Sequence, residues 1–283
     1  MTTTATLPVS AAQAARQTGL QPRHAVTFRR TVASEWIKLR SLRSAVWSFA
    51  LIVLVSWGLT LLVSSASEAD GSYLTAAEQV EYVFQAATFG VFFGQLVAAV
   101  LGVLVISGEY STGMIRSTLT AVPTRTSVLV AKALVVGVTT FIVALIANFG
   151  AFLIAAPLLA DQGMHADLFR DSVAAPLTIA ALYLSVVAIF ALGLGAIVRS
   201  SAGGIAAALG AILLLPIAVA MMPFDWTRDI ASFLLMNAGM ESFGLLVFGM
   251  PSGMESWQLI LVTCAWAAVT LLVGVVLLKH RDG

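Results

Sequence analysis

The chain has 283 residues, of which 59% are hydrophobic and only 10% are charged. A soluble domain is nearer half apolar and a quarter charged, so this composition excludes a water-soluble fold and predicts an all-α membrane protein. The single cysteine, Cys264, excludes a disulfide framework and a CxxC motif, and the three scattered histidines form no metal-binding pattern.

The first 27 residues are predicted to be a disordered cytoplasmic tail. They contain Thr, Ala and Arg but no acidic residue, and this composition leaves a transit peptide open as an alternative. The first apolar run begins only near residue 46, so no cleavable secretory signal is expected.

Residues 28–44 are predicted to form an amphipathic helix in the cytoplasmic headgroup layer. Five apolar residues fall on one stripe at helical spacing: Phe28, Val32, Trp36, Leu39 and Leu42. Basic residues flank the stripe: Arg29, Arg30, Lys38, Arg40 and Arg43. A tryptophan within an apolar face with basic flanks is typical of an interfacial helix, and a plain basic flank of the first span is the alternative.

Glu35 lies on the apolar side of this stripe, where an unpaired carboxylate is costly. Three interpretations are open: Glu35 pairs with a basic neighbour, points at a partner protein, or reaches up to water.

Six apolar runs without an acidic or basic residue are long enough to cross a bilayer, which needs about 20 residues. They are about 46–64, 85–106, 133–158, 173–198, 203–222 and 257–278. Pro157 and Pro216 are expected to kink or break the third and fifth of these helices.

The second run carries a small residue at every fourth position, which allows another helix to approach closely. These residues are Ala86, Gly90, Gly94, Ala98 and Gly102. They indicate either packing inside one subunit, or a seam between two subunits or along a cargo path.

The segment 107–132 joins the second and third runs, and its only acidic residue is Glu109. Gly108 and Gly113 permit tight turns at a helix end. There is room for a short helix between Gly113 and Pro123, which would suit either docking of another protein or a plain connection.

The run 230–250 is long enough to span but contains Asn237, Glu241 and three glycines. We interpret it as a re-entrant helical hairpin before the last span, with Asn237 and Glu241 as candidates for an external gate. A seventh crossing would move Lys279 and Arg281 to the other side and weaken the charge pattern described next.

The charged residues predict the orientation. With six crossings, the side that holds both termini carries thirteen of the fifteen Lys and Arg residues and three acidic residues, and the other side carries eleven acidic residues. By the positive-inside rule, both termini lie in the cytoplasm of a bacterial plasma membrane.

Two motifs and the span plan resemble the permease subunits of type-2 ATP-binding-cassette exporters, especially actinobacterial ones. The motifs are the segment Ser34-Glu35-Trp36-Ile37-Lys38-Leu39-Arg40-Ser41-Leu42-Arg43-Ser44 before the first span, and Gly108-Glu109-Tyr110 with Gly113-Met114-Ile115-Arg116-Ser117-Thr118-Leu119 after the second. Pro123, Arg125 and Lys132 follow in the order usual for the family. The resemblance covers nearly the whole chain from residue 28.

This resemblance implies an interfacial helix at 28–44 and a coupling region at about 109–125 that contacts an ATPase. It also implies two permease copies, more readily a homodimer than a heterodimer, and two ATPase subunits that bind ATP and Mg. The candidate coupling residues are Glu109, Tyr110, Gly113, Arg116 and Arg125, and those of the interfacial helix are Glu35, Trp36, Lys38, Arg40 and Arg43.

The chain has no GxxxxGK[ST] motif, HExxH motif or GxSxG motif, so we expect no catalytic residue and no cofactor on this chain, and ATP hydrolysis by a partner. The expected cargo is amphipathic: a drug, a peptide antibiotic or a lipid-like molecule. We expect contacts with membrane lipids and none with nucleic acid.

Two alternatives stay open: a six-span immunity, sensor or scaffold protein, and an ion-coupled carrier. Asn148, the one strongly polar side chain deep in a span, is expected to bond a neighbouring helix rather than cargo.

Overall fold

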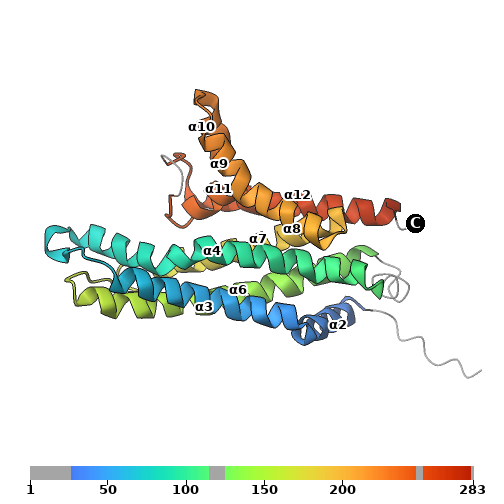
Figure 1. Cartoon of the computed structure of the whole chain (residues 1–283), viewed down its shortest axis with the longest axis horizontal. Coiled ribbons are helices and arrows are strands. Elements are labelled where there is room, and N and C mark those ends of the chain that lie inside the picture. Colours follow the sequence, from blue (N-terminus) through green and yellow to red (C-terminus); the bar gives the residue numbers. More distant parts are fainter. Residues whose placement is uncertain (1–26, 115–124, 247–250, 282–283) are drawn as a thin grey trace, which may run out of the picture.

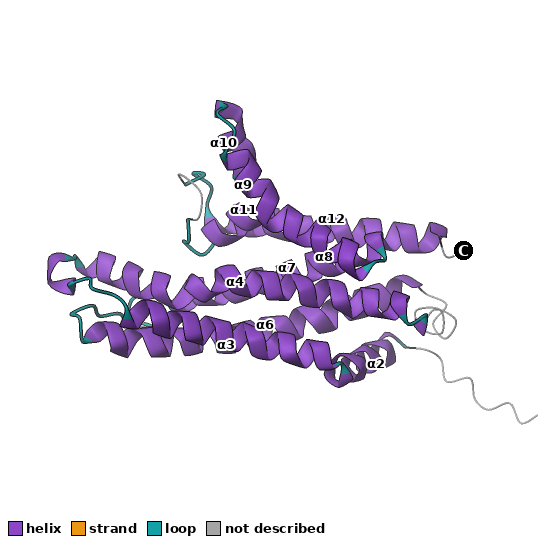
Figure 2. Ribbon diagram, in the orientation of Figure 1, coloured by secondary structure: helices purple, strands orange, loops and turns teal. Residues whose placement is uncertain are grey.

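The computed structural model describes residues 27–114, 125–246 and 251–281, and every regular element within these ranges is a helix (Figures 1 and 2). Six of the helical segments in the described ranges are long and apolar enough to cross a membrane, which confirms the predicted all-α fold. They are α3 (Arg43–Ser65), α4 (Ala76–Ser111), α6 (Arg125–Ala160), α7 (Ala174–Val198), the continuous stretch Ser201–Ala220, and α12 (Ser256–Arg281).

Four of these helices, α3, α4, α6 and α7, run side by side as the main bundle (Figure 1). Helix α7 lies in the interior of the bundle. Of the residues in its most apolar part, 72% are buried, compared with 22% for the corresponding part of α3. Because α7 packs against α4, α6 and α12, most of its side chains are buried by protein, whereas α3 and α12 leave wide apolar faces for lipid.

Two spanning helices begin earlier than predicted, because charged residues near their start are capped or paired. Helix α4 begins at Ala76, where Thr75 and Glu78 form a capping box that satisfies free N–H groups of the first turn. Helix α6 begins at Arg125 and contains Lys132, whose ammonium is paired. The charge-free runs 85–106 and 133–158 therefore begin later than the helices that contain them.

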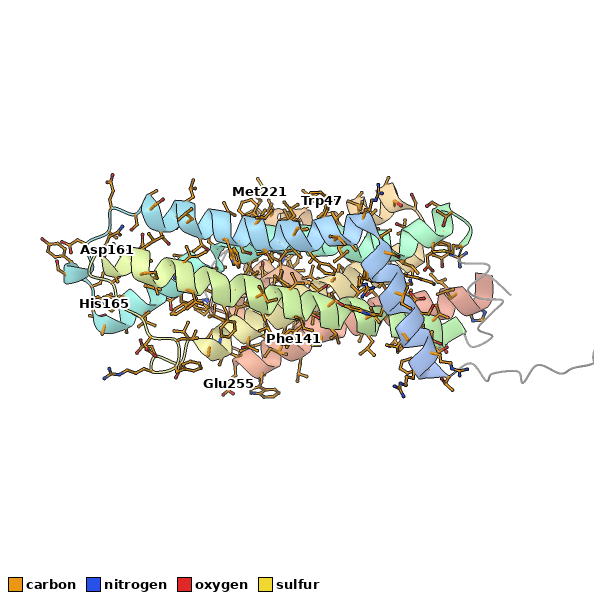
Figure 3. All side chains as sticks on the ribbon, turned by 90° about the horizontal axis from the view of Figure 1, so that it is seen from below. Trp47, Phe141, Asp161, His165, Met221 and Glu255 are labelled. Carbon is orange, nitrogen blue, oxygen red and sulfur yellow. The ribbon has the colours of Figure 1, made fainter. Side chains whose placement is uncertain are left out.

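Helix α2 (Phe28–Ser41) runs across one end of the bundle instead of along it (Figure 3). The predicted segment 28–44 is divided at Leu42, whose extended backbone (φ −80°, ψ 109°) turns the chain into α3. The predicted apolar stripe is also divided: Leu39 faces the bundle, whereas Phe28, Trp36 and Leu42 remain exposed.

In the fifth spanning stretch a π-helical turn departs from regular α-helix just ahead of Pro216, where a kink or break was predicted. Helix α6, in contrast, continues past Pro157 to its end at Ala160. The fifth stretch consists of α8 (Ser201–Leu209), the π-helical turn η2 (Gly210–Leu214) and α9 (Leu215–Ala220). Helix α8 packs against α4 and α7, and beyond η2 the chain leaves the bundle as an arm formed by α9 and α10 (Asp225–Ala231) (Figure 1).

The predicted hairpin 230–250 contains the end of α10 and the helix α11 (Leu235–Glu241), and residues 247–250 lie outside the described ranges. Each of these helices has seven residues, too few to cross a bilayer. Helix α11 packs against α12 and α7. A short 3-10 turn, η1 (Gly71–Tyr73), lies in the connection between α3 and α4.

Both ends of the described chain lie at the same end of the bundle. Helix α2 and the last turn of α12 are at the end opposite Asp161 and His165 (Figures 1 and 3). An even number of crossings requires this arrangement, and the cytoplasmic location of this end stays a prediction from the charges.

Candidate functional site

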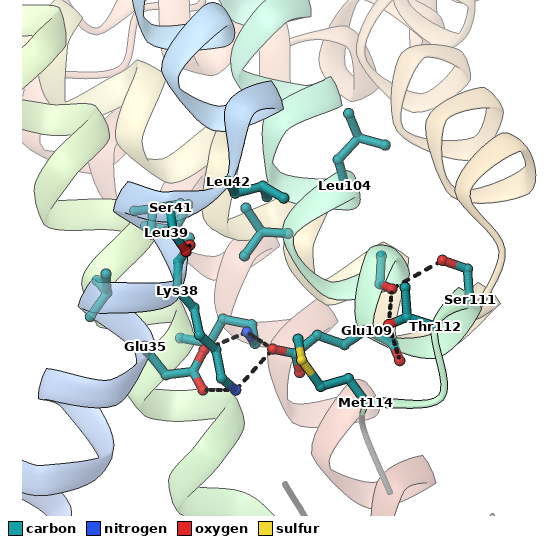
Figure 4. A pocket seen from close by; sticks show the side chains of 15 residues that line it. Glu35, Lys38, Leu39, Ser41, Leu42, Leu104, Glu109, Ser111, Thr112 and Met114 are labelled. Carbon is teal, nitrogen blue, oxygen red and sulfur yellow. Dashed lines mark hydrogen bonds and ion pairs between the residues drawn. The ribbon is translucent and has the colours of Figure 1, made fainter. Parts of the chain in front are cut away.

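Four charged side chains close a ring at the end of the bundle that holds α2 and the last turn of α12 (Figure 4). Lys38 Nζ donates to Glu35 Oε1 at 2.7 Å and to Glu109 Oε1 at 3.0 Å. Lys132 Nζ donates to Glu35 Oε2 at 2.5 Å and to Glu109 Oε1 at 3.0 Å. The charges therefore alternate around the ring, which we call the ion ring, and it is electrically neutral.

The ion ring joins three helices that are far apart in the sequence. Glu35 and Lys38 come from α2, Glu109 from the last turns of α4, and Lys132 from the third turn of α6. Since α2 crosses the bundle, its buried face of Thr31, Glu35 and Leu39 is the one that turns Glu35 towards α6.

Three members of the ring are buried: Lys132 is 2% exposed, Glu35 3% and Glu109 4%. Buried charges are tolerated only where each has an opposite charge and hydrogen bonds, and removal of one partner leaves an uncompensated charge at a cost of about 3–5 kcal/mol. The ring therefore holds α2 against α4 and α6 in one specific arrangement.

Lys38 is the member of the ring nearest to water. Burial by itself lowers the pKa of its ammonium, but the hydrogen bond to Glu35 and the charge of Glu109 outweigh that effect, so the net pKa is raised above the usual 10.5. Lys38 is thus charged at any physiological pH.

A cavity of about 370 Å³ adjoins the ion ring between α2, α4 and α6 (Figure 4). All four charged residues border it, and its other walls are largely apolar, with Leu42, Leu104 and Val136 among them. The space lies beside the end of α4, so this helix end is not packed tightly against α2.

Helix α4 ends at the start of the predicted coupling segment. Residues 107–111 are helical, and the chain turns at Gly113, whose φ of +71° favours glycine. The hydroxyl groups of Ser111 and Thr112 donate to the Gly108 carbonyl at 3.0 and 2.9 Å, which satisfies an acceptor that the helix end leaves free. The short helix expected between Gly113 and Pro123 falls mainly on 115–124, outside the described residues.

The structure brings some of the predicted site residues together and separates others. Glu35, Lys38 and Glu109 meet in the ion ring, whereas Trp36, Arg40 and Arg43 lie on the exposed side of α2 and its junction with α3. The aromatic ring of Tyr110 lies under the guanidinium of Arg199. Arg116 is not among the described residues, and of Arg125 only the backbone at the start of α6 is described.

The small residues of α4 pack inside the subunit. A Cβ atom at Gly90 would lie 2.4 Å from Ser56 Cα in α3, and one at Gly102 would lie 2.1 Å from the Ala188 carbonyl oxygen in α7. Gly94 faces Leu184 of α7, and Ala86 and Ala98 are buried as well. Of the two interpretations of this pattern, contact between helices of one chain is the one that these distances support.

Near α11, Glu241 accepts hydrogen bonds from the Ser252 N–H and hydroxyl at 2.6 and 2.7 Å and so holds the connection to α12. Asn237 is half-buried on α11, and Gly239 lies against the ring of Tyr183. Asn148 donates to the Leu177 carbonyl at 3.2 Å, as expected for a bond between neighbouring helices.

Sequence reasoning did not include Lys132 or Arg199 among the site residues. Lys132 carries a usable signal, because it is the single charge between Thr126 and Ala160 in an otherwise apolar helix. Such a lysine must find an acid, and Glu109, alone at the end of α4, is the natural partner. Arg199 carries no such signal, because it resembles any basic residue after a span.

Residues 31–283 match the family model described as ABC-2 family transporter protein. The match covers all six spanning helices and every residue of the ion ring. A search of curated proteins found no significant match.

Proposed function

Because this chain belongs to the ABC-2 transporter family and is a membrane permease of an ABC transporter, we propose that it moves an amphipathic substrate outward, driven by ATP that a separate ATPase subunit hydrolyses. In this proposal the end of the bundle with the ion ring faces the cytoplasm. Two copies of the chain, as a homodimer, associate with two ATPase subunits, which bind ATP and Mg.

The observation that carries this proposal is the ion ring at the end of α4. The coupling segment leaves α4 at Gly113, four residues after Glu109. A displacement of this segment by a moving ATPase would reach Glu109 within one helical turn. Glu109 is paired with α2 through Lys38 and with α6 through Lys132, so both helices would respond together.

The ring suits such a role better than an apolar contact would. Ion pairs of this kind have discrete partners, so the three helices have one defined arrangement and resist small sliding movements. The adjoining cavity gives the end of α4 room to shift towards α2. In this mechanism Glu109 acts as a mechanical link and has no catalytic role.

At the opposite end, we propose that α10 and α11 form the external gate, with Asn237 and Glu241 among its residues. The hydrogen bond from Trp266 Nε1 to the Phe233 carbonyl, at 2.8 Å, joins the turn between α10 and α11 to α12. Movement of α12 would therefore reach the gate. The described spanning helices are apolar along their length, and the ion ring lies at one end of them. An apolar surface of this kind supports an amphipathic cargo.

The proposal is tested by purifying the full chain from its own cells and identifying bound proteins and small molecules by mass spectrometry. We expect an ATPase with a phosphate-binding P-loop to co-purify. In the purified complex, Phe233→Cys in a Cys264→Ala background reports on the gate, and its rate of thiol labelling should change on addition of MgATP and again with vanadate.

Phe169→Cys is the matched control, because Phe169 is 81% exposed on the loop between α6 and α7 and lies on neither α10 nor α11. Its labelling rate should not respond to nucleotide. Absence of an ATPase, together with a Phe233→Cys rate that ignores MgATP, would overturn the proposal and favour a six-span protein without ATP coupling. A rate that responds to a proton gradient instead would indicate an ion-coupled carrier.

A further inference from the structure

Arg199 occupies a backbone conformation that normally selects glycine. It is the C-cap of α7, with φ 59° and ψ 16°, in the left-handed region that a Cβ atom disfavours. Ser172 is the one other non-glycine residue with positive φ in the described ranges, at the opposite end of α7. An arginine where glycine fits more easily indicates that the side chain compensates for the backbone strain.

The side chain of Arg199 reaches two other helix ends. Its guanidinium Cζ lies 5.3 Å from the centre of the Tyr110 ring, on the last turn of α4. Its Nη2 donates to the Leu277 carbonyl, near the end of α12, at 3.5 Å. Two residues further along, the Ser201 hydroxyl donates to that of Ser107 in α4 at 2.8 Å, or accepts from it.

The end of α4 therefore has two connected faces. Glu109 links one face to α2 and α6 through the ion ring, and the adjacent Tyr110 links the other to the connection between α7 and α8. Helix α8 leads through η2 into α9 and α10, the arm that leaves the bundle (Figure 1). Arg199 thus lies just before α8, the helix that packs against α4 and α7 and leads into the arm.

We infer that Arg199 is a positioning residue that ties the α7–α8 connection and the end of α12 to the end of α4, so that a displacement of α4 reaches the arm and α12 as well as α2 and α6. This inference rests on the proposed function for its consequence in transport. The contacts themselves are independent of it. A cation–π contact between a guanidinium and an aromatic ring suits the task, because it survives small sliding of one surface over the other.

We call the contacts of Arg199 with Tyr110 and with the Leu277 carbonyl the Arg199 clamp. Arg199→Gly is the decisive variant, because it removes this clamp while glycine readily adopts the backbone conformation of residue 199. The measurement is the distance distribution between spin labels at Ser111→Cys and His280→Cys, at the ends of α4 and α12, in a Cys264→Ala background of the full chain in lipid nanodiscs. We expect longer and broader distances with Arg199→Gly and a melting temperature that is unchanged or raised. An unchanged distribution would overturn the inference.

Ser172→Gly is the matched control, since it relieves the same kind of backbone strain at the other end of α7 without touching the clamp. It should leave the distribution unchanged. Tyr110→Phe retains the aromatic ring and should match the parent, whereas Tyr110→Leu should match Arg199→Gly. If Tyr110→Leu matches the parent instead, the cation–π contact is not what holds the two helix ends, and the clamp is refuted.

In the complex with the ATPase, Arg199→Gly should abolish the nucleotide-dependent change in labelling of Phe233→Cys, while Ser172→Gly preserves it. A full nucleotide response in Arg199→Gly would refute the transmission role. If the parent complex itself shows no nucleotide response, the proposed function fails. The spin-label distances still decide whether Arg199 ties the helix ends.

Discussion

Glu109 lies between two lysines from different helices, and this position determines which substitution is informative. Glu109→Lys is the obvious substitution for reversing the charge of a candidate coupling residue. In the ion ring it would bring three ammonium groups together at a site where Glu109 is 4% exposed. Neutral variants are therefore the better probes.

We predict that the double variant Glu109→Gln with Lys132→Gln is more stable than Glu109→Gln alone. The single variant leaves two buried or half-buried ammonium groups with one carboxylate, at a cost of about 3–5 kcal/mol, whereas the double variant leaves the neutral pair of Glu35 and Lys38. Melting temperatures in nanodiscs measure the difference. Equal melting temperatures would show that the ring is not a coupled unit.

A second prediction concerns the alkaline limit of the ion ring. The pKa of Lys38 is raised above 10.5 in the folded chain, so its charge contributes stability that is fully present below pH 10.5 and is lost as pH rises through the folded-state value. The difference in melting temperature between the parent and Lys38→Gln should be constant from about pH 6 to 9 and shrink only above 10.5. A difference that already closes near neutrality would contradict the pairing.

Among single residues, the sequence indicates Glu35 and Glu109 as unusual because each is an isolated acid in apolar or basic surroundings. It does not indicate that Lys38 and Lys132 each pair with both carboxylates. Glu35 and Lys132 are 97 positions apart, and they meet only because α2 turns across the bundle at Leu42. That turn depends on packing of three helices, which no local pattern encodes.

At the scale of single helices, the close approach of α4 to its neighbours gives the sharpest prediction. A Cβ atom at Gly102 would lie 2.1 Å from a backbone oxygen of α7, whereas one at Gly94 would lie 3.6 Å from the flexible side chain of Leu184. We expect Gly102→Ala to destabilise the chain by about 1–3 kcal/mol or more. Gly94→Ala should be neutral or stabilising, because alanine favours helix by about 0.5–1 kcal/mol.

Unfolding of the two variants in denaturing detergent, monitored by circular dichroism, measures this contrast. Equal effects would mean that the contact between α4 and α7 is loose enough to absorb a methyl group. A loss of dimer with retained monomer stability in Gly94→Ala would instead revive the interpretation of this face as a subunit seam.

The positions of the helices were largely predictable, and the errors have one physical origin. Apolar runs locate the six spanning segments because a helix in lipid must be apolar along its length. The runs start late at α4 and α6 because Glu78 is satisfied by a local capping box and Lys132 by an ion pair with the distant Glu35. The interruption before Pro216 follows from the missing N–H of proline, but the departure of α9 and α10 from the bundle does not follow from any pattern in these residues.

At the scale of the whole molecule, the crossings and the charges together define an axis. Helix α2 and the end of α12 lie at one end of the bundle and Asp161 at the other (Figures 1 and 3). With six crossings, thirteen of the fifteen Lys and Arg residues fall on the side with α2, the basic end, and eleven of the fourteen acidic residues on the other. The ion ring and the Arg199 clamp lie at the basic end, and α10 and α11 lie towards the other. In the proposed function, a signal that enters at the basic end travels along the spanning helices to reach the loops at the end with Asp161.

The last prediction tests this axis directly. Two exposed residues at opposite ends, Ser34 on α2 and Phe169 between α6 and α7, are replaced one at a time by cysteine in a Cys264→Ala background. Because positive loops stay in the cytoplasm, a membrane-impermeant thiol reagent added to intact cells should label Phe169→Cys and spare Ser34→Cys. After permeabilisation both should be labelled. The reverse pattern would invert the molecule and place the ion ring away from ATP, and labelling of both in intact cells would contradict the six-span topology.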